Sequence, residues 1–196
     1  MKTYIALLRG INVGGSHALS MKELKLLLEN EGCVDVQTYI QSGNVIFRRA
    51  TSSVSALAKQ LTAAISRSRG FEPLVVVLTQ GELESAAAAN PYAEADENPR
   101  SLHLFFLAER PKNPDLRALE TLKARTERFA LEGNVFYLHA PEGIGRSKLA
   151  ERAERLLGVN ATARNWRTVT TLLKMTRDSA RPIDQGRNST VKGSPR

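Results

Sequence analysis

The chain has 196 residues, of which 42% are hydrophobic and 24% charged, a composition typical of a folded globular protein and not of a disordered one. No apolar run reaches the roughly 18 to 20 residues that cross a bilayer, so no membrane insertion is expected. The apolar run after Lys2 ends at Arg9, too short for a secretory signal, and the single cysteine, Cys33, suits a reducing compartment. We therefore expect a cytoplasmic protein of bacterial type.

The net charge of +8 belongs to one part of the chain. Residues 1–145 hold 16 basic and 16 acidic residues, whereas residues 146–196 hold 12 basic and 4 acidic ones. A local excess of this kind attracts polyanions, but a solvated helix pair with a basic tail has the same composition. Both interpretations stay open. Residues 178–196 are rich in Arg, Pro, Gly and Ser, and we predict that they form a disordered basic tail.

The first ninety residues alternate between strand and helix patterns. Aliphatic, aromatic and β-branched runs predict strands at 3–9, 34–40, 45–47 and 74–78. Capping boxes, Ser20 with Glu23 and Thr79 with Glu82, predict the starts of two helices, and a third helix is predicted over Val54–Arg69. Up to the fourth strand, and so before the helix that starts after Thr79, the resulting order is β-α-β-β-α-β, that of a ferredoxin-like split βαβ unit.

The second half of the chain is predicted to repeat this arrangement. Residues 91–100 are expected to form a solvated linker that contains Glu94, Asp96 and Glu97. Beyond it come a strand at 102–108, a helix marked by leucines at 116, 119 and 122, and a hairpin at 131–137. That hairpin aligns with residues 41–47 through a shared Gly-Asn-Val, which indicates a duplication. Two helices, 147–157 and 163–175, are predicted to follow with no strand between them.

The expected fold class is therefore α+β, with two ferredoxin-like halves related by duplication and extra C-terminal helices. The first half is predicted to comprise residues 1–90 and the second, with the C-terminal helices, residues 101–177. The linker covers 91–100 and the tail 178–196.

Two polar turns that carry glycine form the first candidate site. One follows the opening strand, and the other joins the strands at 34–40 and 45–47. Strands one and two of a split βαβ sheet run parallel, so both turns are expected at one edge of the sheet, which we call the rim (residues 9–15 and 41–44). The predicted ligand-binding residues of the rim are Arg9, Asn12, Gly14, Gly15, Gln41, Ser42 and Asn44.

An arginine fork and side-chain amides recognise carboxylate or phosphate, and glycines allow a close approach of the backbone. Local roles are the alternative. Asn44 is then only the left-handed residue of its turn, Ser42 a turn acceptor, and Arg9 an ion-pair partner of the second half.

Two further segments are candidates for anion binding. Arg146, Ser147 and Lys148 follow a glycine-bearing loop and open a helix, where free N–H groups attract anions, although Ser147 is equally explained as an N-cap. Arg164 and Asn165 are placed at the start of the last helix, next to Trp166, which is predicted to be buried. Neither a Walker A loop nor a GxGxxG motif is present, so nucleotide hydrolysis and dinucleotide binding lack support.

Catalytic residues cannot be assigned from the sequence. Ser42 and His17 form a conceivable nucleophile and base, but no third group accompanies them. Cys33 is interpreted as a small buried residue. No spacing of His, Cys, Asp and Glu predicts a metal site, and no cofactor is predicted.

Several motifs in combination resemble a known family. They are Tyr-Ile-Ala-Leu-Leu-Arg-Gly-Ile-Asn-Val-Gly-Gly at 4–15, Met21, Thr-Tyr-Ile-Gln-Ser-Gly-Asn-Val-Ile-Phe at 38–47, Gly-Ile-Gly-Arg-Ser-Lys-Leu at 143–149 and Thr-Ala-Arg-Asn-Trp-Arg at 162–167. Together they are similar to the bacterial domain-of-unknown-function family 1697 (DUF1697). The resemblance implies a duplicated α+β fold with ferredoxin-like halves and no established activity.

The function predicted first is binding of a phosphate-bearing ligand at the rim, either nucleic acid or a nucleotide-like small molecule. An enzyme acting on a small polar substrate in a cleft between the halves, lined by both hairpins, is the second hypothesis. In the third, the polar turns are structural and join the halves. Whether the protein is an enzyme, and its oligomeric state, are not predicted.

Overall fold

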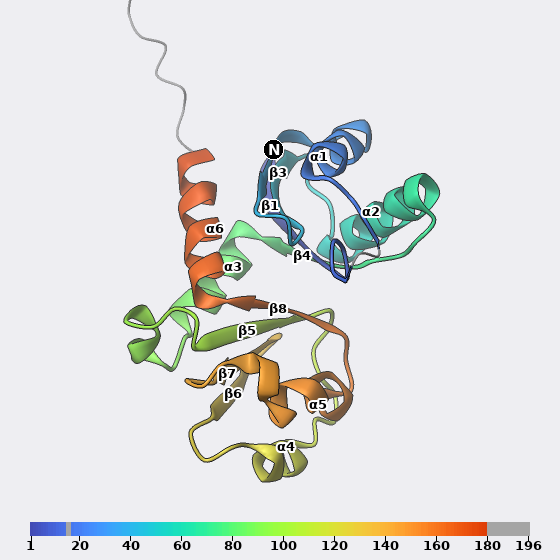
Figure 1. Ribbon diagram of the computed structural model, residues 1–196. Helices are drawn as coiled ribbons and strands as arrows, with labels where there is room; N and C mark the ends of the chain where they lie inside the picture. Colours follow the sequence, from blue (N-terminus) through green and yellow to red (C-terminus); the bar gives the residue numbers. More distant parts are fainter. Residues whose placement is uncertain (15–16, 180–196) are drawn as a thin grey trace, which may run out of the picture.

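The computed structural model describes residues 1–14 and 17–179, and Figure 1 shows their arrangement. These residues form an α+β structure with two four-stranded antiparallel sheets and six α-helices. None of the helices in the described part of the chain is long and apolar enough to span a membrane. The first seven elements are β1 (Lys2–Arg9), α1 (Met21–Asn30), β2 (Val34–Tyr39), β3 (Asn44–Arg49), α2 (Val54–Arg69), β4 (Leu74–Thr79) and α3 (Gln80–Ala88).

The first sheet has the strand order β2-β3-β1-β4. Helices α1 and α2 pack on one face of it, where Leu24, Leu61 and Phe47 belong to one buried apolar cluster. The local signals in the sequence are confirmed here. Ser20 and Thr79 form capping boxes at the starts of α1 and α3, and Gly70 ends α2 in a left-handed conformation, at φ 73°.

The second sheet has the order β6-β7-β5-β8. Leu149 and Leu157 of α5 and Leu119 of α4 pack on its outer face. The elements of this half are the 3₁₀ turn η1 (Ala93–Asp96), β5 (Leu102–Leu107), α4 (Leu116–Leu122), β6 (Arg128–Glu132), β7 (Val135–His139), the 3₁₀ turn η2 (Ile144–Arg146), α5 (Lys148–Leu157), β8 (Ala161–Asn165) and α6 (Trp166–Ser179).

Strand β8 corrects the prediction that the last helix begins at residue 163. Residues 161–165 pair antiparallel with β5, with Arg164 opposite Leu104. The sequence Ala-Thr-Ala-Arg-Asn has little β propensity, so pairing with a buried neighbour decides its conformation. Helix α6 therefore begins at Trp166 and extends to Ser179, two residues into the predicted tail. The rest of that tail, 180–196, lies outside the described residues.

The strand registers also correct the alignment of the two hairpins. The N–H of Leu8 donates to the carbonyl of Gly43 (2.8 Å), and that of Leu107 donates to the carbonyl of Asn134 (2.9 Å). In the structure Gly43 therefore occupies the same position as Asn134. The alignment by the shared Gly-Asn-Val instead pairs Gly43 with Gly133, so it is shifted by one residue. Since a shift of one residue reverses the face of every side chain, Asn44 occupies the inner position that Val135 has in the second sheet.

A third core lies between the two sheets. It contains Leu7 of β1, Phe106 of β5, and Trp166 and Leu172 of α6. Helices α3 and α6 lie side by side in this layer (Figure 1), and α6 packs against β3 although it follows the second sheet in the chain. The hydroxyl of Tyr137 donates to the carbonyl of Ala86 across the same layer (2.7 Å). Because the two halves share this core, side chains from both can form one site.

The segment 91–100 is not simply a solvated linker. Glu94 forms an ion pair with Arg128, and the indole N–H of Trp166 donates to Asp96 (2.7 Å). The guanidinium of Arg128 lies 4.9 Å from the centre of the Tyr92 ring, a cation–π distance. Of the three acidic residues Glu94, Asp96 and Glu97, only Glu97 is exposed and has neither an ion pair nor a side-chain hydrogen bond to another described residue. The segment is therefore fastened to the second half.

Acid pH is expected to destabilise the fold through His103 on β5. Burial lowers the pKa of His103 from 6.5 to about 4, and its Nδ1 has no hydrogen-bond partner among the described residues. As the pH falls below 6.5, His103 becomes protonated in the unfolded chain, whereas in the folded protein it stays neutral until about pH 4. The free energy of unfolding therefore decreases as the pH falls from 6.5 to 4. His103→Phe should flatten the dependence of the melting temperature on pH between 6.5 and 4. Parallel curves for the two proteins would contradict this.

Candidate functional site

Asn12 joins the two turns of the rim. Its backbone is left-handed, at φ 54°, and its side-chain Nδ2 donates to the carbonyls of Leu19 (2.8 Å) and Gln41 (3.0 Å). Its Oδ1 accepts from the N–H of Leu19 (2.8 Å). The prediction that the two turns lie at one edge of the sheet is thus confirmed by a direct contact. Both amide donors of Asn12 are used within the protein.

Arg164, on β8 of the second half, reaches across to the rim. Its side chain is buried, with 8% exposed, and it projects from β8 toward the turns. Its guanidinium donates to side-chain oxygens of Asn44 and Thr162 and to the backbone carbonyls of Leu8, Ser42, Gly43 and Ala163. Burial lowers its pKa to about 10, so the group stays charged at neutral pH. We call Arg164 and these partners the clamp, since they join the first sheet to the second.

Asn44 is the clamp residue that the hairpin supplies. It is fully buried, and its Nδ2 donates to the carbonyl of Tyr39 (3.1 Å) and to the hydroxyl of Ser42 (3.0 Å), while its Oδ1 accepts from Arg164. The alternative that Asn44 is the left-handed residue of its turn is wrong. Positive φ angles occur instead at Ile40 (48°) and Gly43 (73°).

Arg9 points away from the hairpin toward α5. Its Nη1 pairs with the carboxylate of Glu154 and donates to the carbonyl of Ala161 (2.9 Å). The ion pair to the second half, one of the alternatives for Arg9, is thereby confirmed. Gly14 is left-handed, at φ 61°, and Gly15 lies outside the described residues. The side chain of Gln41 is exposed.

The predicted cations at the start of α5 do not join the rim. Ser147 is the N-cap of α5, where its hydroxyl accepts from the N–H of Ala150 (3.0 Å), and Arg146 and Lys148 are exposed. Arg9 meets the same helix at Glu154, about 9 Å farther along its axis at 1.5 Å per residue. Asn165 has a local role as well, because its Oδ1 accepts from the N–H of Thr168 at the start of α6 (2.9 Å).

The imagined pair of Ser42 and His17 is not assembled. The His17 ring stacks on Phe71, with centroids 4.5 Å apart, and its Nδ1 lies 3.0 Å from the carbonyl of Gly10. The Ser42 hydroxyl accepts from Asn44 instead. Cys33 is buried, as predicted, and burial raises the pKa of its thiol. Among the described residues no cluster of His, Cys, Asp and Glu is placed to hold a metal ion.

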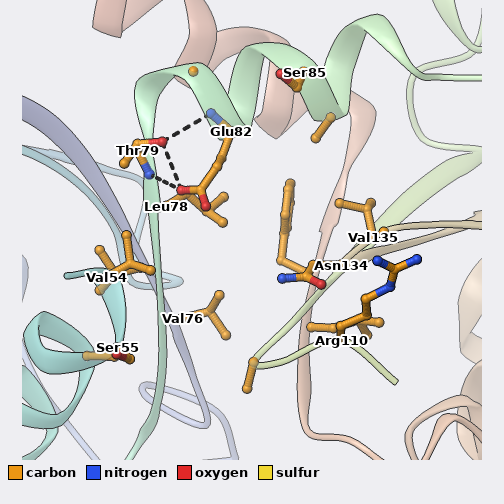
Figure 2. Close-up of a pocket in the computed structure, with 18 of the residues that line it drawn as sticks. Val54, Ser55, Val76, Leu78, Thr79, Glu82, Ser85, Arg110, Asn134 and Val135 are labelled. Atoms are coloured by element: carbon orange, nitrogen blue, oxygen red, sulfur yellow. Dashed lines mark hydrogen bonds between the residues drawn. The ribbon is translucent and has the colours of Figure 1, made fainter. Parts of the chain in front are cut away.

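A cavity of about 840 Å³ lies between the two halves, and we call it the cleft. Figure 2 shows it between β4 on one side and the tip of the β6–β7 hairpin on the other, with α3 above. Of the two hairpins, only the second contributes, through Glu132–Val135. The predicted cleft lined by both hairpins is therefore wrong in that detail. The walls come from residues 54–59 of α2, 75–79 of β4, 81–89 of α3, 106–110 at the end of β5, and 132–137.

The lining combines apolar surface with a few polar groups. Val76, Leu78, Phe106 and Val135 are among its apolar members. The polar members include Ser55, Lys59, Glu82, Ser85, Arg110, Glu132 and Asn134.

Some of these polar groups are committed within the protein and others are not. The Glu82 carboxylate accepts from the N–H (2.7 Å) and hydroxyl (2.8 Å) of Thr79. Lys59 and Arg110 are exposed, on opposite walls, and form no ion pair within the described residues. Judged by the described residues, the lining charges without an ion-pair partner are thus these two cations and the exposed Glu132.

Fold and site together define a two-sheet α+β protein with a clamped interface and a cleft between its halves. The chain belongs to the DUF1697 family, described as "Protein of unknown function", whose model matches residues 1–137. Its motifs at 143–149 and 162–167 lie beyond the matched residues.

A solved structure, that of a conserved bacterial protein from Streptococcus pneumoniae, is similar to the chain with a TM-score of 0.64 and 23% identity. The match covers 89% of this chain and 98% of that one, and at this identity it shows a shared fold. No curated protein matches the chain.

Proposed function

We propose that this protein binds an elongated, largely apolar organic molecule with an anionic end in the cleft. The observation that carries the proposal is a cavity of about 840 Å³ with walls from both halves. Ligand pockets commonly measure roughly 300 to 1,000 Å³ and combine apolar walls with a few polar groups. The valine, leucine and phenylalanine side chains would bury the body of the ligand, at about 25 cal/mol per Å² of apolar surface.

The uncommitted cations favour a ligand with one anionic end. Arg110 offers a planar fork that fits carboxylate or phosphate, and Lys59 adds a point charge from the opposite wall. Catalysis is less well supported than binding. The described lining contains neither His nor Cys, and the Tyr137 hydroxyl is committed to Ala86.

The rim is assigned a structural role in this proposal. A phosphate-bearing ligand there, whether nucleic acid or a nucleotide-like molecule, would compete with bonds that Asn12, Asn44 and Arg164 already make inside the protein. The clamp instead holds the first sheet against the second and so sets the width of the cleft. The third hypothesis from the sequence, that polar turns join the halves, is the one these contacts favour.

The finer description of the fold is part of the same proposal. Both halves share the element order β-α-β-β-α-β and the same strand order within the sheet, and we interpret this as the ferredoxin-like arrangement. We interpret them as a duplication of units 1–90 and 101–177, joined by 91–100. The cleft and the clamp would then have arisen at the interface between the copies.

Filling the cleft should weaken ligand binding while leaving the fold intact. Ser85 is exposed on the α3 wall, and its side chain forms no hydrogen bond among the described residues. We expect Ser85→Trp to weaken binding at least about tenfold, a loss of ~1.4 kcal/mol. The probes are medium-chain and aryl-substituted carboxylates and phosphate monoesters, screened by thermal shift and measured by calorimetry.

Ala88→Trp is the matched control, because Ala88 is exposed on the same helix but does not line the cleft. It should bind every hit as the unmodified protein does. Hits that bind Ser85→Trp and the unmodified protein equally well would rule out the cleft as their site, and a panel without hits would count against the proposed ligand class.

A further inference from the structure

Strand β4 presents an open edge to the cleft. In the described part of the chain it pairs with β1 alone, and β8, although close to it, pairs with β5. Five consecutive residues, Val75–Thr79, line the cleft. Successive side chains of a strand point to opposite faces, so a cleft over one face would touch alternate residues only. The cleft therefore lies along the edge of β4.

The space beside this edge is bounded by α2 on one side and by α3 on the other. Val77 belongs to the core under α2, whereas Val76 belongs to the core between the sheets. The α2 wall contributes Ala58 and the α3 wall Ala86. An extended segment beside β4 would thus direct alternate side chains toward α2 and toward α3, and each would meet apolar surface.

The edge of β4 lacks the charged residues, prolines and bulges that usually keep an edge strand from pairing with another strand. Strand β4 reads Leu-Val-Val-Val-Leu-Thr, without charge or proline, and its pairing with β1 is continuous from Leu74 to Thr79 without a bulge. Unpaired apolar edges of this kind template pairing with another strand unless something covers them. The first sheet is antiparallel throughout, so one more strand would continue its pattern.

We propose that the occupant of the cleft is an extended peptide segment that adds to β4 as a fifth strand of the first sheet. This inference rests on the proposed function and names the class of ligand. Five extended residues span about 17 Å and match the five residues of β4 that line the cleft. Main-chain hydrogen bonds to β4 supply affinity, and alternating apolar side chains supply specificity. An acidic residue at one end meets Arg110 or Lys59.

A heptapeptide display library selected on the full chain tests the inference. We expect selected peptides to alternate apolar residues and to carry an acidic residue. N-methylation of the backbone at alternate positions should weaken binding about tenfold for each methyl group, since each removes one main-chain hydrogen bond to β4. N-methylation at the intervening positions, whose N–H groups face away from β4, should change the affinity less than about threefold.

Two cleft-filling variants complete the test. Ser85→Trp fills the cleft from α3, and Ala108→Trp fills it from the end of β5, so a folding defect in one leaves the other informative. Peptides should lose binding to both and keep it to Ala88→Trp. Equal effects of N-methylation at all positions, or a library without binders sensitive to filling, would overturn the peptide inference. If the carboxylate and phosphate probes still bind in the cleft, the proposed function stands without it; if they do not, both are overturned.

Discussion

Arg164→Met is expected to destabilise the protein by about 3 to 5 kcal/mol, the largest effect of any single substitution considered. The substitution removes a buried cation whose guanidinium serves six acceptors from three separate segments of chain. The carbonyls of Leu8, Ser42 and Gly43 would be left without this donor next to the first sheet. Methionine fills similar space but donates nothing, so the loss reports on the hydrogen bonds.

Urea unfolding measured side by side with Arg167→Met checks this expectation. Arg167 is exposed, its side chain makes no bond among the described residues, and its replacement should change stability by less than about 0.5 kcal/mol. Arg164→Lys should recover only a small part of the loss, because an ammonium group cannot reproduce the planar fork. A loss below about 1 kcal/mol for Arg164→Met would show that the clamp contributes no more than an ordinary surface contact.

Gly43→Ala is expected to cost about 2 to 4 kcal/mol, for two reasons that add. Gly43 is left-handed, at φ 73°, which costs a residue with a Cβ about 1 to 2 kcal/mol. The new Cβ would also lie 2.7 Å from the Cβ of Leu8 and 2.8 Å from the Cδ1 of Ile11. Since the Leu8 Cβ is attached directly to the backbone of β1, it can move away only if the strand shifts.

Gly133→Ala in the second hairpin is the matched control. Gly133 is also left-handed, at φ 57°, but a Cβ there would meet nothing within 4 Å. We expect Gly133→Ala to lower the free energy of unfolding only by the cost of the left-handed backbone, about 1 to 2 kcal/mol. Thermal and urea unfolding of both variants separates the two contributions. Equal losses would contradict the close packing of the first hairpin against β1.

The elements with local signals were predictable from the sequence. Ser20 and Thr79 began their helices as capping boxes, and Gly70 ended α2 where a left-handed residue was required. The same holds for the meeting of the two turns of the rim, which follows from the parallel direction of β1 and β2. These features depend on residues close in sequence or on a rule of topology.

Features set by distant contacts were not predictable in this way. Strand β8 exists because residues 161–165 pair with β5, although Ala161, Ala163 and Arg164 by themselves favour a helix over a strand. The register of the hairpins differs from the shared Gly-Asn-Val because it is decided by pairing with β1 and β5. Arg164 resembles any surface arginine in the sequence, yet its acceptors include Leu8 and Asn44, more than 100 residues away.

The lining of the cleft could mostly not be predicted from the sequence either. The residues that line it are spread between positions 54 and 137 of the chain. Its distinctive feature is an unpaired strand edge, and no type of residue in the sequence indicates one. One signal was present. The run at 74–79 has no charge or proline to protect an edge, and such a run indicates a strand that is covered by something.

Solution NMR of the full chain tests most directly the claim that the ligand binds in the cleft and not at the rim, since it observes signals from both regions separately. Methyl signals of Val76, Leu78 and Val135 report on the cleft, and amide signals of Gly10, Asn12 and Ser42 report on the rim. The probe is an aryl-substituted carboxylate such as 3-phenylpropionate, added in steps. We predict saturable shifts of the cleft methyls with the rim amides unmoved. Saturable shifts at the rim, with the cleft methyls unmoved, would contradict the assignment of the cleft as the binding site.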